Sequence, residues 1–406
     1  MIVIVPGAVL IGLGVGVFWL ARRRAARWLV VVAGVLGAVG LGAVCVYVWA
    51  ATATDTSQFA RTIVWGESEF GDQHRFAAHP LGASVQPVTF APAGVAALAD
   101  YTDAEGRPLE QLLADNDSTA FVVLRGDQLL YERYFNGSDH DDIQTSFSVA
   151  KSVVATLVGI ATDEGHLADL DDAVSIYVPE LLVRDERFGE ITLRHLMTMS
   201  SGLSFEEGSG PWDDPANTYH GTDLRTAVVE TPDIVRPPGT EFDYNDWNVI
   251  LLGLVLERAT GMSVSEYATS RLWQPMGAEA DGSWSLDSAE FGFEKMFVGV
   301  NGRAIDFAKL GWIYLHDGHS GDVQVVSSAF VAEATRRETT TDPVDWYQYL
   351  WWAEEDRDAY YANGDHGQFI WVDPATDLVI VRHGRGPGGV DWVDLFADLA
   401  DFLAAD

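Results

Sequence analysis

Ser148 and Lys151 are the two residues of this chain whose types and spacing best suit covalent catalysis. They lie three positions apart, and the apolar run that follows at 152–160 predicts a buried helix. Residues at i and i+3 share a helix face, with about 5–6 Å between their Cβ atoms, so the lysine amine can reach the serine hydroxyl. A serine beside an amine base is an activated nucleophile, and Ser-x-x-Lys is a known serine-acylation spacing.

A purely structural interpretation of this pair is also open, with Ser148 as a helix N-cap and Lys151 as a solvated residue of the first turn. Two observations favour chemistry. Apolar residues surround Lys151 in the sequence, so it has no evident route to water, and the chain has only three lysines against 22 arginines. Arginine cannot replace a lysine that must give up a proton. We expect burial and the nearby helix N-terminus to lower the pKa of Lys151.

Two apolar stretches at the start of the chain predict a membrane anchor. Residues 1–20 and 28–50 contain no charged residue, and each approaches the ~20 residues that a helix needs to cross the hydrocarbon layer. The segment 21–27 between them carries four arginines, and such loops stay cytoplasmic. We therefore expect a transmembrane helical hairpin over residues 1–50, with the rest of the chain outside the cytoplasm. The alternative is a cleaved signal peptide with its cleavage site at 51–53, which needs a later translation start.

The chain is strongly acidic, with a formal net charge of −35. Its first 50 residues hold four arginines and no acidic residue, so the remainder carries −39. This charge would repel phosphates, which argues against nucleic acid as a partner. The carboxylates are spread along the chain, which favours a hydrated surface suited to high salt, as in halophilic proteins. The single cysteine, Cys45, allows no disulfide within the chain, and no His-Glu-x-x-His motif or other metal cluster is visible.

The remaining chain divides into an arm and one large domain. Residues 51–100, with several prolines and glycines, read as an extended arm, and residues 101–406 are long enough for a large core. A β-hairpin signal at 121–135 precedes the Ser148 helix, and mainly helical periodicity follows over 163–318. Strands are then predicted at 347–352, 359–362, 369–372 and 378–382, and an amphipathic helix at 391–405. This order predicts an α+β architecture with the catalytic helix at the seam between layers.

The chain resembles a known family in five segments: 146–152, 164–172, 192–203, 238–245 and 363–368. Together they resemble the penicillin-recognising serine hydrolases, a group of class C β-lactamases, D-alanyl-D-alanine peptidases, esterases and amidases, and within it most of all the 6-aminohexanoate-oligomer hydrolases. The resemblance covers roughly residues 115–405 and implies the β-lactamase and penicillin-binding-protein fold, an antiparallel sheet flanked by helices with a large helical subdomain.

The resemblance assigns a role to Tyr244. It matches the family's catalytic tyrosine, which faces the serine and relays protons. The family motif is Tyr-x-Asn, whereas this chain has Asp246 at the third position. Asn245 or Asn248 is a candidate for the missing amide, so both Asn245 and Asp246 belong to the expected substrate-binding region.

The third catalytic segment departs further from the β-lactamase pattern. β-Lactamases and peptidases place Lys-Thr-Gly on a strand edge to hold a substrate carboxylate, but no lysine occurs at 362–368, and Asp365 adds negative charge. A β-lactam carboxylate should therefore bind poorly. The expected contacts to substrate come from Gly364, Asp365, His366 and Gly367. We expect the oxyanion donors to be the backbone N–H groups of Ser148 and of one residue in 364–369, with Asp365 favoured.

These observations predict a membrane-tethered, extracytoplasmic serine hydrolase of small-molecule esters or amides. Ser148 would be the nucleophile, Lys151 its base and Tyr244 the proton relay, with no metal or organic cofactor implied. One alternative with the same chemistry is a β-lactamase or D-Ala-D-Ala carboxypeptidase. An alternative of another class is a sensor domain that is acylated without turnover. An α/β-hydrolase is disfavoured because the chain has no Gly-x-Ser-x-Gly motif.

Overall fold

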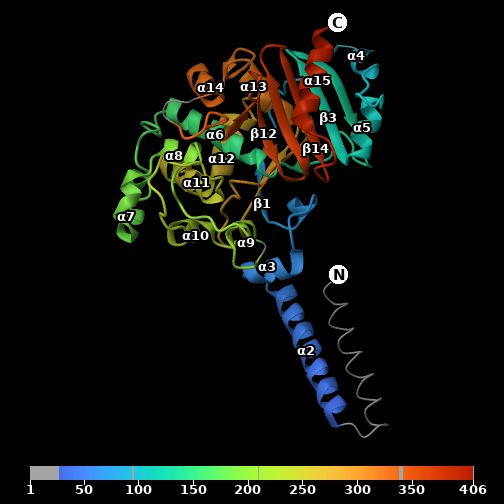
Figure 1. Cartoon of the computed structure of the whole chain (residues 1–406). Helices are drawn as coiled ribbons and strands as arrows, with labels where there is room; N and C mark the ends of the chain where they lie inside the picture. Colours follow the sequence, from blue (N-terminus) through green and yellow to red (C-terminus); the bar gives the residue numbers. More distant parts are fainter. Residues whose placement is uncertain (1–26, 94–95, 209, 338–341, 406) are drawn as a thin grey trace. The chain divides into compact units, whose positions relative to one another are not determined.

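The computed structural model describes residues 27–93, 96–208, 210–337 and 342–405. The chain forms two compact units, one of Met1–Ser68 with Glu206–Thr222, and one of Glu69–Phe205 with Asp223–Asp406. Figure 1 shows the path of the chain through both. The expected boundary at residue 100 is therefore replaced by one near residue 68, with a later segment of the chain returning to the first unit.

The first unit is helical. Its helix α2 (Arg27–Thr52) contains a 22-residue stretch, Val31–Thr52, that is long and apolar enough to cross a membrane, although a signal sequence has the same length and composition. The first span of the expected hairpin, residues 1–20, lies outside the described residues. Helix α3 (Gln58–Trp65) packs against α9 (Asp214–His220), where the Gln58 amide donates to the carbonyl of Pro211 at 2.8 Å.

The second unit is built on an eight-stranded sheet with the order β10-β11-β12-β13-β14-β3-β4-β2. All neighbours pair antiparallel except β2 with β4. The β-hairpin expected at 121–135 and the later strands are confirmed, although the region 347–352 divides into two short strands, because Tyr349 and Leu350 between them have positive φ angles. The strands are β2 (Ala91–Pro92), β3 (Ser118–Arg125), β4 (Gln128–Tyr134), β10 (Tyr347–Gln348), β11 (Trp351–Ala353), β12 (Tyr360–Gly364), β13 (Gln368–Asp373) and β14 (Leu378–Gly384).

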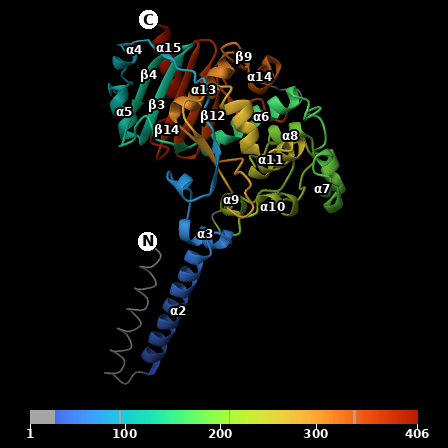
Figure 2. The same ribbon diagram turned by 180° about the vertical axis from the view of Figure 1, so that it is seen from behind.

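Helices cover both faces of this sheet, as the opposite views of Figures 1 and 2 show. The expected C-terminal amphipathic helix is α15 (Trp392–Ala404), which packs with α5 (Leu109–Asp115) on one face around Phe121, Trp371 and Phe396. Helix α13 (Ala304–Leu315) covers the other face. Gly311 permits this close packing, since a Cβ there would lie only 2.6 Å from Cγ1 of Val379.

A second, four-stranded sheet corrects the expectation of an extended arm. It has the order β1-β6-β7-β5, and β1 (Ala78–Leu81) pairs along its length with β6 (Gly282–Ser285). Backbone hydrogen bonds from Ser84 and Val88 to the 277–278 turn continue this attachment. Residues 69–93 are thus part of the folded unit, because their backbone groups complete a sheet edge. The other strands are β7 (Val300–Gly302) and β5 (Gln144–Thr145).

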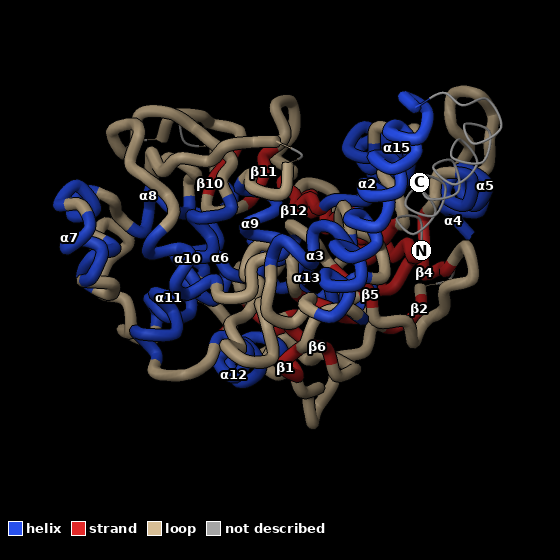
Figure 3. The backbone as a smooth tube through the Cα atoms, turned by 90° about the horizontal axis from the view of Figure 1, so that it is seen from below, coloured by secondary structure: helices blue, strands red, loops and turns tan. Residues whose placement is uncertain are grey.

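The expected helical region lies between the two parts of the large sheet in the sequence. Figure 3 shows α7 (Glu180–Arg184), α8 (Leu193–Met197) and α10 (Leu224–Glu230) of this region on one side of β12 and β4. Two of its helices matter for the site: α6 (Val149–Asp163), which is buried almost throughout, and α11 (Asp246–Thr260), which packs against it. This part also contains α12 (Val264–Ala268), and α14 (Ser328–Thr335) follows α13 in the chain.

Candidate active site

Ser148 lies at the N-cap position of α6, and the residue directly before it has an unusual backbone conformation for a non-glycine residue. Phe147, buried at 1% exposure, has a φ of 44°, in the left-handed region that non-glycine residues rarely adopt. Such backbone strain is often found at functional sites. The Ser148 side chain makes no capping hydrogen bond to α6. Its hydroxyl is thus available for another role, and the capping interpretation of this residue is wrong.

Lys151 meets Ser148 as the spacing predicts. Its Nζ donates to Ser148 Oγ at 2.9 Å and to the carbonyl of Phe297 at 3.4 Å. The residue is 1% exposed, so it is not a solvated first-turn lysine. A third partner, which sequence reasoning did not anticipate, is the carboxylate of Asp246, whose Oδ1 lies 2.9 Å from Lys151 Nζ. The amine therefore lies between the nucleophile and a negative charge.

This carboxylate reverses the expected direction of the Lys151 pKa. Burial lowers the pKa of Lys151, but the negative charge of Asp246 is the largest of the effects that raise it, and the result lies above the ordinary value. The expectation of a lowered pKa is wrong, because it considered burial and the helix N-terminus without the nearby carboxylate.

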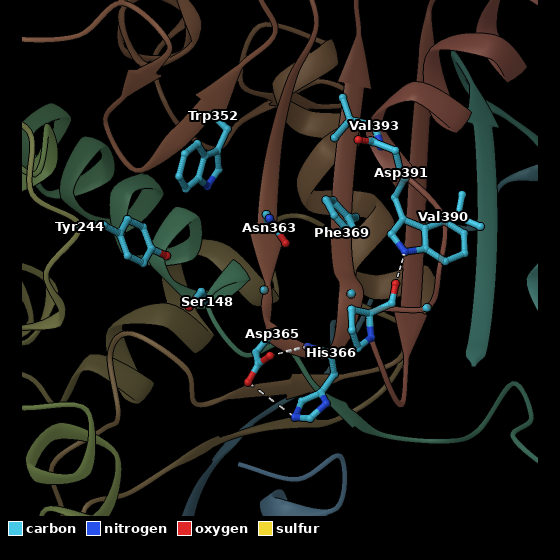
Figure 4. Close-up of a pocket in the computed structure, with 15 residues that line it drawn as sticks. Ser148, Tyr244, Trp352, Asn363, Asp365, His366, Phe369, Val390, Asp391 and Val393 are labelled. Carbon is cyan, nitrogen blue, oxygen red and sulfur yellow. Dashed lines mark hydrogen bonds and ion pairs between the residues drawn. The ribbon is translucent and has the colours of Figure 1, made fainter. Parts of the chain in front are cut away.

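Tyr244 stands across the site from α6, just before the start of α11. The Lys151 Nζ lies 4.7 Å from the centre of its ring. Figure 4 shows its hydroxyl directed toward Ser148. Aromatic contacts fix the ring, with Tyr347 at 6.1 Å and Trp352 at 5.7 Å between centroids. The structure thus brings Ser148, Lys151 and Tyr244 together.

Asn245 and Asn248 have structural partners. Asn245 is 1% exposed, caps α11 by accepting from Trp247 N at 2.9 Å, and donates to Leu203 O at 3.0 Å. Asn248 is equally buried, accepts from the Ser201 hydroxyl and contacts the Met199 sulfur. Their amides hold the entry to α11 in place, and neither side chain lines the pocket beside Ser148.

The third segment brings the end of β12 against the nucleophile turn. Gly364 lies so close to it that a Cβ would be 2.5 Å from Ser146 O and 3.0 Å from Ser148 N. Only glycine leaves this space open. Asp365, His366 and Gly367 follow in a short 3₁₀ turn, where His366 has a φ of 59° and its ring packs on Phe147 at 4.9 Å. All four residues line the same pocket as Ser148.

The pocket itself has a volume of about 580 Å³ and continues past Ser148 toward the start of α15. Figure 4 shows Ser148 and Tyr244 at one end and Val390 with its neighbours at the other. Two carboxylates line it, Asp365 and Asp391, and none of its described lining residues is Lys or Arg. Sequence reasoning missed the far wall, although the turn-rich stretch before the last helix was visible as a signal. Asn363 and Phe369, which belong to the expected third catalytic region, also line the pocket. The missed lining residues are Trp352, Pro387, Gly388, Val390, Asp391, Trp392 and Val393.

Comparison with known families agrees with this geometry. The family described as Beta-lactamase matches residues 109–401. The 6-aminohexanoate-dimer hydrolase of Paenarthrobacter ureafaciens is 32% identical over 308 residues, which cover 69% of this chain and 75% of that protein. Esterase EstB of Burkholderia gladioli is 29% identical over 189 residues, covering 42% of this chain and 48% of the esterase.

Solved structures share the fold. A protein from Bacillus anthracis, provisionally assigned as a 6-aminohexanoate-dimer hydrolase, superimposes with a TM-score of 0.74 at 24% identity, covering 83% of this chain and 94% of that one. A β-lactamase-like protein from Bacteroides dorei gives a TM-score of 0.61 at 18% identity, covering 72% and 98%. The expected β-lactamase-like α+β fold is thereby confirmed.

Proposed function

The chain belongs to the Beta-lactamase family and is a serine hydrolase, and we propose that it cleaves ester or amide bonds through an acyl-enzyme formed on Ser148. Lys151 and Tyr244 transfer the protons of this reaction. The observation that carries the proposal is the 2.9 Å contact between the Ser148 hydroxyl and a fully buried lysine amine. This pairing is the arrangement that an activated serine requires.

The proposed reaction proceeds in two halves. Neutral Lys151 takes the hydroxyl proton while Ser148 Oγ bonds to the carbonyl carbon and the carbonyl electron pair moves to oxygen. Backbone N–H groups of Ser148 and Asp365 stabilise this oxyanion, and such a donor is worth about 10²–10³ in rate. Tyr244 protonates the departing alcohol or amine and regains a proton from Lys151. Water then attacks the acyl-enzyme by the same route and releases the acid.

The charge of the pocket supports a substrate class. Asp365 and Asp391 line it, and its described lining includes no fixed cation to bind a carboxylate. Trp352, Phe369, Val390 and Val393 supply apolar surface along the same wall. We therefore propose neutral or cationic acyl compounds with an aliphatic part, such as short-chain esters or amine-terminated oligoamides of the kind named for the Paenarthrobacter relative. A penicillin-like anion fits this pocket poorly.

We also propose that α2 tethers the enzyme to a membrane, with the hydrolase unit extracytoplasmic. The apolar stretch Val31–Thr52 and the four arginines at 22–27 support this orientation. Protease added to intact cells should digest the hydrolase unit and leave a membrane-bound stump. Full protection of the chain until the cells are lysed would contradict the orientation.

The mechanism is tested with Ser148→Ala and Lys151→Arg in the full chain, purified in detergent. Both variants should lose turnover of p-nitrophenyl butyrate and of short amides. The first lacks the nucleophile, and the second carries a cation that cannot accept a proton. Ser152→Ala is the matched control, since Ser152 lies on the same helix and donates instead to Leu350 O. Mass spectrometry of the quenched wild-type enzyme should find the acyl group on Ser148. Folded variants with wild-type turnover would refute the proposal.

The substrate class is tested with matched esters that end in an ammonium, a methyl or a carboxylate group. We expect kcat/KM to be highest for the ammonium ester and lowest for the carboxylate ester, with the difference shrinking as salt rises. Asp365→Asn should reduce the discrimination. A preference for the carboxylate ester, or rapid turnover of nitrocefin, would favour the β-lactamase or peptidase alternative.

A further inference from the structure

Asp246 places a carboxylate where it reaches the catalytic amine. Its Oδ1 lies 2.9 Å from Lys151 Nζ, with side-chain exposures of 17% for Asp246 and 2% for Lys151. Asp246 is the first residue of α11, and its position is fixed by the buried cap Asn245 immediately before it. The carboxylate is thus held by the backbone of a well-anchored helix start.

The partners of Lys151 match the hydrogen-bonding capacity of an ammonium ion. An ammonium has three N–H donors and no acceptor. Three oxygen acceptors surround Nζ: Ser148 Oγ at 2.9 Å, Asp246 Oδ1 at 2.9 Å and Phe297 O at 3.4 Å. A neutral amine could make the same contacts only with its lone pair toward the Ser148 hydroxyl, which can donate as well as accept, because the carboxylate and the carbonyl only accept. The ionised carboxylate 2.9 Å from Nζ favours the charged form of Lys151, with which it forms an ion pair.

We propose that Asp246 is a positioning residue for the hydrolysis, whose carboxylate holds the Lys151 amine against Ser148 in the ammonium form and thereby sets the pH at which the enzyme gains its proton acceptor. This inference rests on the proposed function, in which neutral Lys151 accepts the Ser148 proton. Asp246 itself does not line the pocket and acts through Lys151. The resting ammonium must release one proton to solvent before Ser148 can transfer its own.

Other titratable groups also lie near Lys151. Tyr244 lies beside Lys151, and the ring of Tyr347 in β10 packs against the Tyr244 ring. Lys295 Nζ lies 5.7 Å from the centre of the Phe297 ring, and Lys151 Nζ lies 5.5 Å from the same centre. Burial opposes a positive charge on Lys151. The pKa of Lys151 is nevertheless raised, with Asp246 the largest contributor in that direction. Replacing this one carboxylate should therefore have a large effect.

The test compares Asp246→Asn with Asp246→Glu in the full chain. The asparagine variant keeps the shape and an acceptor oxygen but removes the charge, so Lys151 should lose its proton more readily. The acidic limb of the pH profile of kcat/KM should move to lower pH by about one unit or more, the scale expected for an opposite charge at this distance. Asp246→Glu should restore the wild-type limb. Asp243→Asn is the matched control, because Asp243 carries the same charge three residues earlier and pairs with Arg236.

A second measurement needs no substrate. The chain contains three lysines, so lysine labelled with ¹³C at Cε gives three side-chain signals, and the one lost in Lys151→Arg belongs to Lys151. Its titration midpoint should fall in Asp246→Asn and stay unchanged in Asp243→Asn. An unchanged midpoint in Asp246→Asn would overturn the role of Asp246, whatever the enzyme hydrolyses.

The activity data separate the remaining outcomes. If the midpoint falls but the alkaline limb of kcat/KM moves instead of the acidic one, the ammonium is the active form, and both the proton-acceptor assignment and this inference are overturned. If Ser148→Ala retains turnover, the proposed function fails, while the lysine signal still reports whether the ion pair exists. A fall in the midpoint together with a downward shift of the acidic limb supports the inference.

Discussion

At the scale of single residues, the three lysines of this chain are all interior residues with specific partners. Lys151, Lys295 and Lys309 are each at most 1% exposed. Lys309 forms ion pairs with Asp306 and Glu279 at 3.0 Å, and Lys295 Nζ lies 4.7 Å from the centre of the Phe76 ring. The rarity of lysine in this chain therefore indicates only that a lysine is buried, and it does not by itself identify a catalytic one. It is the contact with the Ser148 hydroxyl that distinguishes Lys151 as the catalytic candidate.

Gly364 gives a prediction at the same scale. In Gly364→Ala the new methyl group would overlap Ser146 O and crowd Ser148 N, the expected oxyanion donor. We expect kcat to fall by about 10²–10³, the cost of losing one such donor, with a smaller change in KM. The measurement is steady-state hydrolysis of p-nitrophenyl butyrate. Gly389→Ala is the control, since a Cβ there meets only Asn116 Oδ1 at an ordinary 3.6 Å. Equal activity of both variants would show that the Gly364 position is not critical.

At the scale of elements, the site is formed where three separate segments converge. The start of α6 supplies Ser148 and Lys151, the entry to α11 supplies Tyr244 and Asp246, and the end of β12 supplies the wall beside the nucleophile. Buried polar contacts hold the entry to α11 in place: the Asn245 amide donates to Leu203 O, and Asn248 accepts from the Ser201 hydroxyl. Catalytic precision therefore depends on how the elements pack.

Strand β14 carries a buried histidine, His383, whose protonation affects the stability of the fold. His383 is 2% exposed, packs against the Phe307 ring at 5.1 Å, and has no described partner for its Nδ1. Burial, and next the charge of Arg382, lower the pKa of His383 to about 3. The folded protein keeps this ring neutral down to that pH, whereas the unfolded chain protonates it near its ordinary pKa of about 6.5. Folding therefore loses stability as the pH falls from about 6.5 to about 3.

We expect His383→Gln to flatten the acid side of the stability curve. Wild type should lose up to about 1.4 kcal/mol per pH unit from this group within that window, and the variant should lose correspondingly less. Urea unfolding of the full chain at a series of pH values measures the difference. His74→Gln, a change of the same type at an exposed position, is the control for the substitution itself. Parallel curves for His383→Gln and wild type would contradict the prediction.

At the scale of the whole molecule, the excess of carboxylates has few cations to balance it. The chain carries 60 acidic residues against 25 basic ones. Many of the arginines are already paired, for example Arg225 with Glu257 and Arg357 with both Asp373 and Asp401. The remaining negative charges repel one another, and dissolved salt must screen them. The function of this surface as an adaptation to high salt stays a prediction.

Salt removal tests that prediction directly. The Debye length grows from about 3 Å at 1 M to about 30 Å at 0.01 M, so the repulsion spreads over the whole molecule as salt is withdrawn. We expect the full chain in a non-ionic detergent to lose its tertiary structure over this range, with the midpoint followed by near-UV circular dichroism. Sucrose at matched water activity should not replace KCl, since it does not screen charge. A spectrum that stays constant down to 0.01 M would count against the halophilic interpretation.

The sequence by itself determined the features that depend on neighbouring residues. The Ser148–Lys151 contact follows from the i, i+3 geometry of one helix, and the hairpin of β3 and β4 from apolar strands around a tight turn. Motif resemblance added the fold and the position of Tyr244. Tertiary structure decided the contacts between residues far apart in the chain: Asp246 on Lys151, Gly364 against Ser148, and β1 on β6. The physical reason is that a pKa or a close backbone approach depends on every group within a few ångströms, and local spacing specifies only those in the same segment.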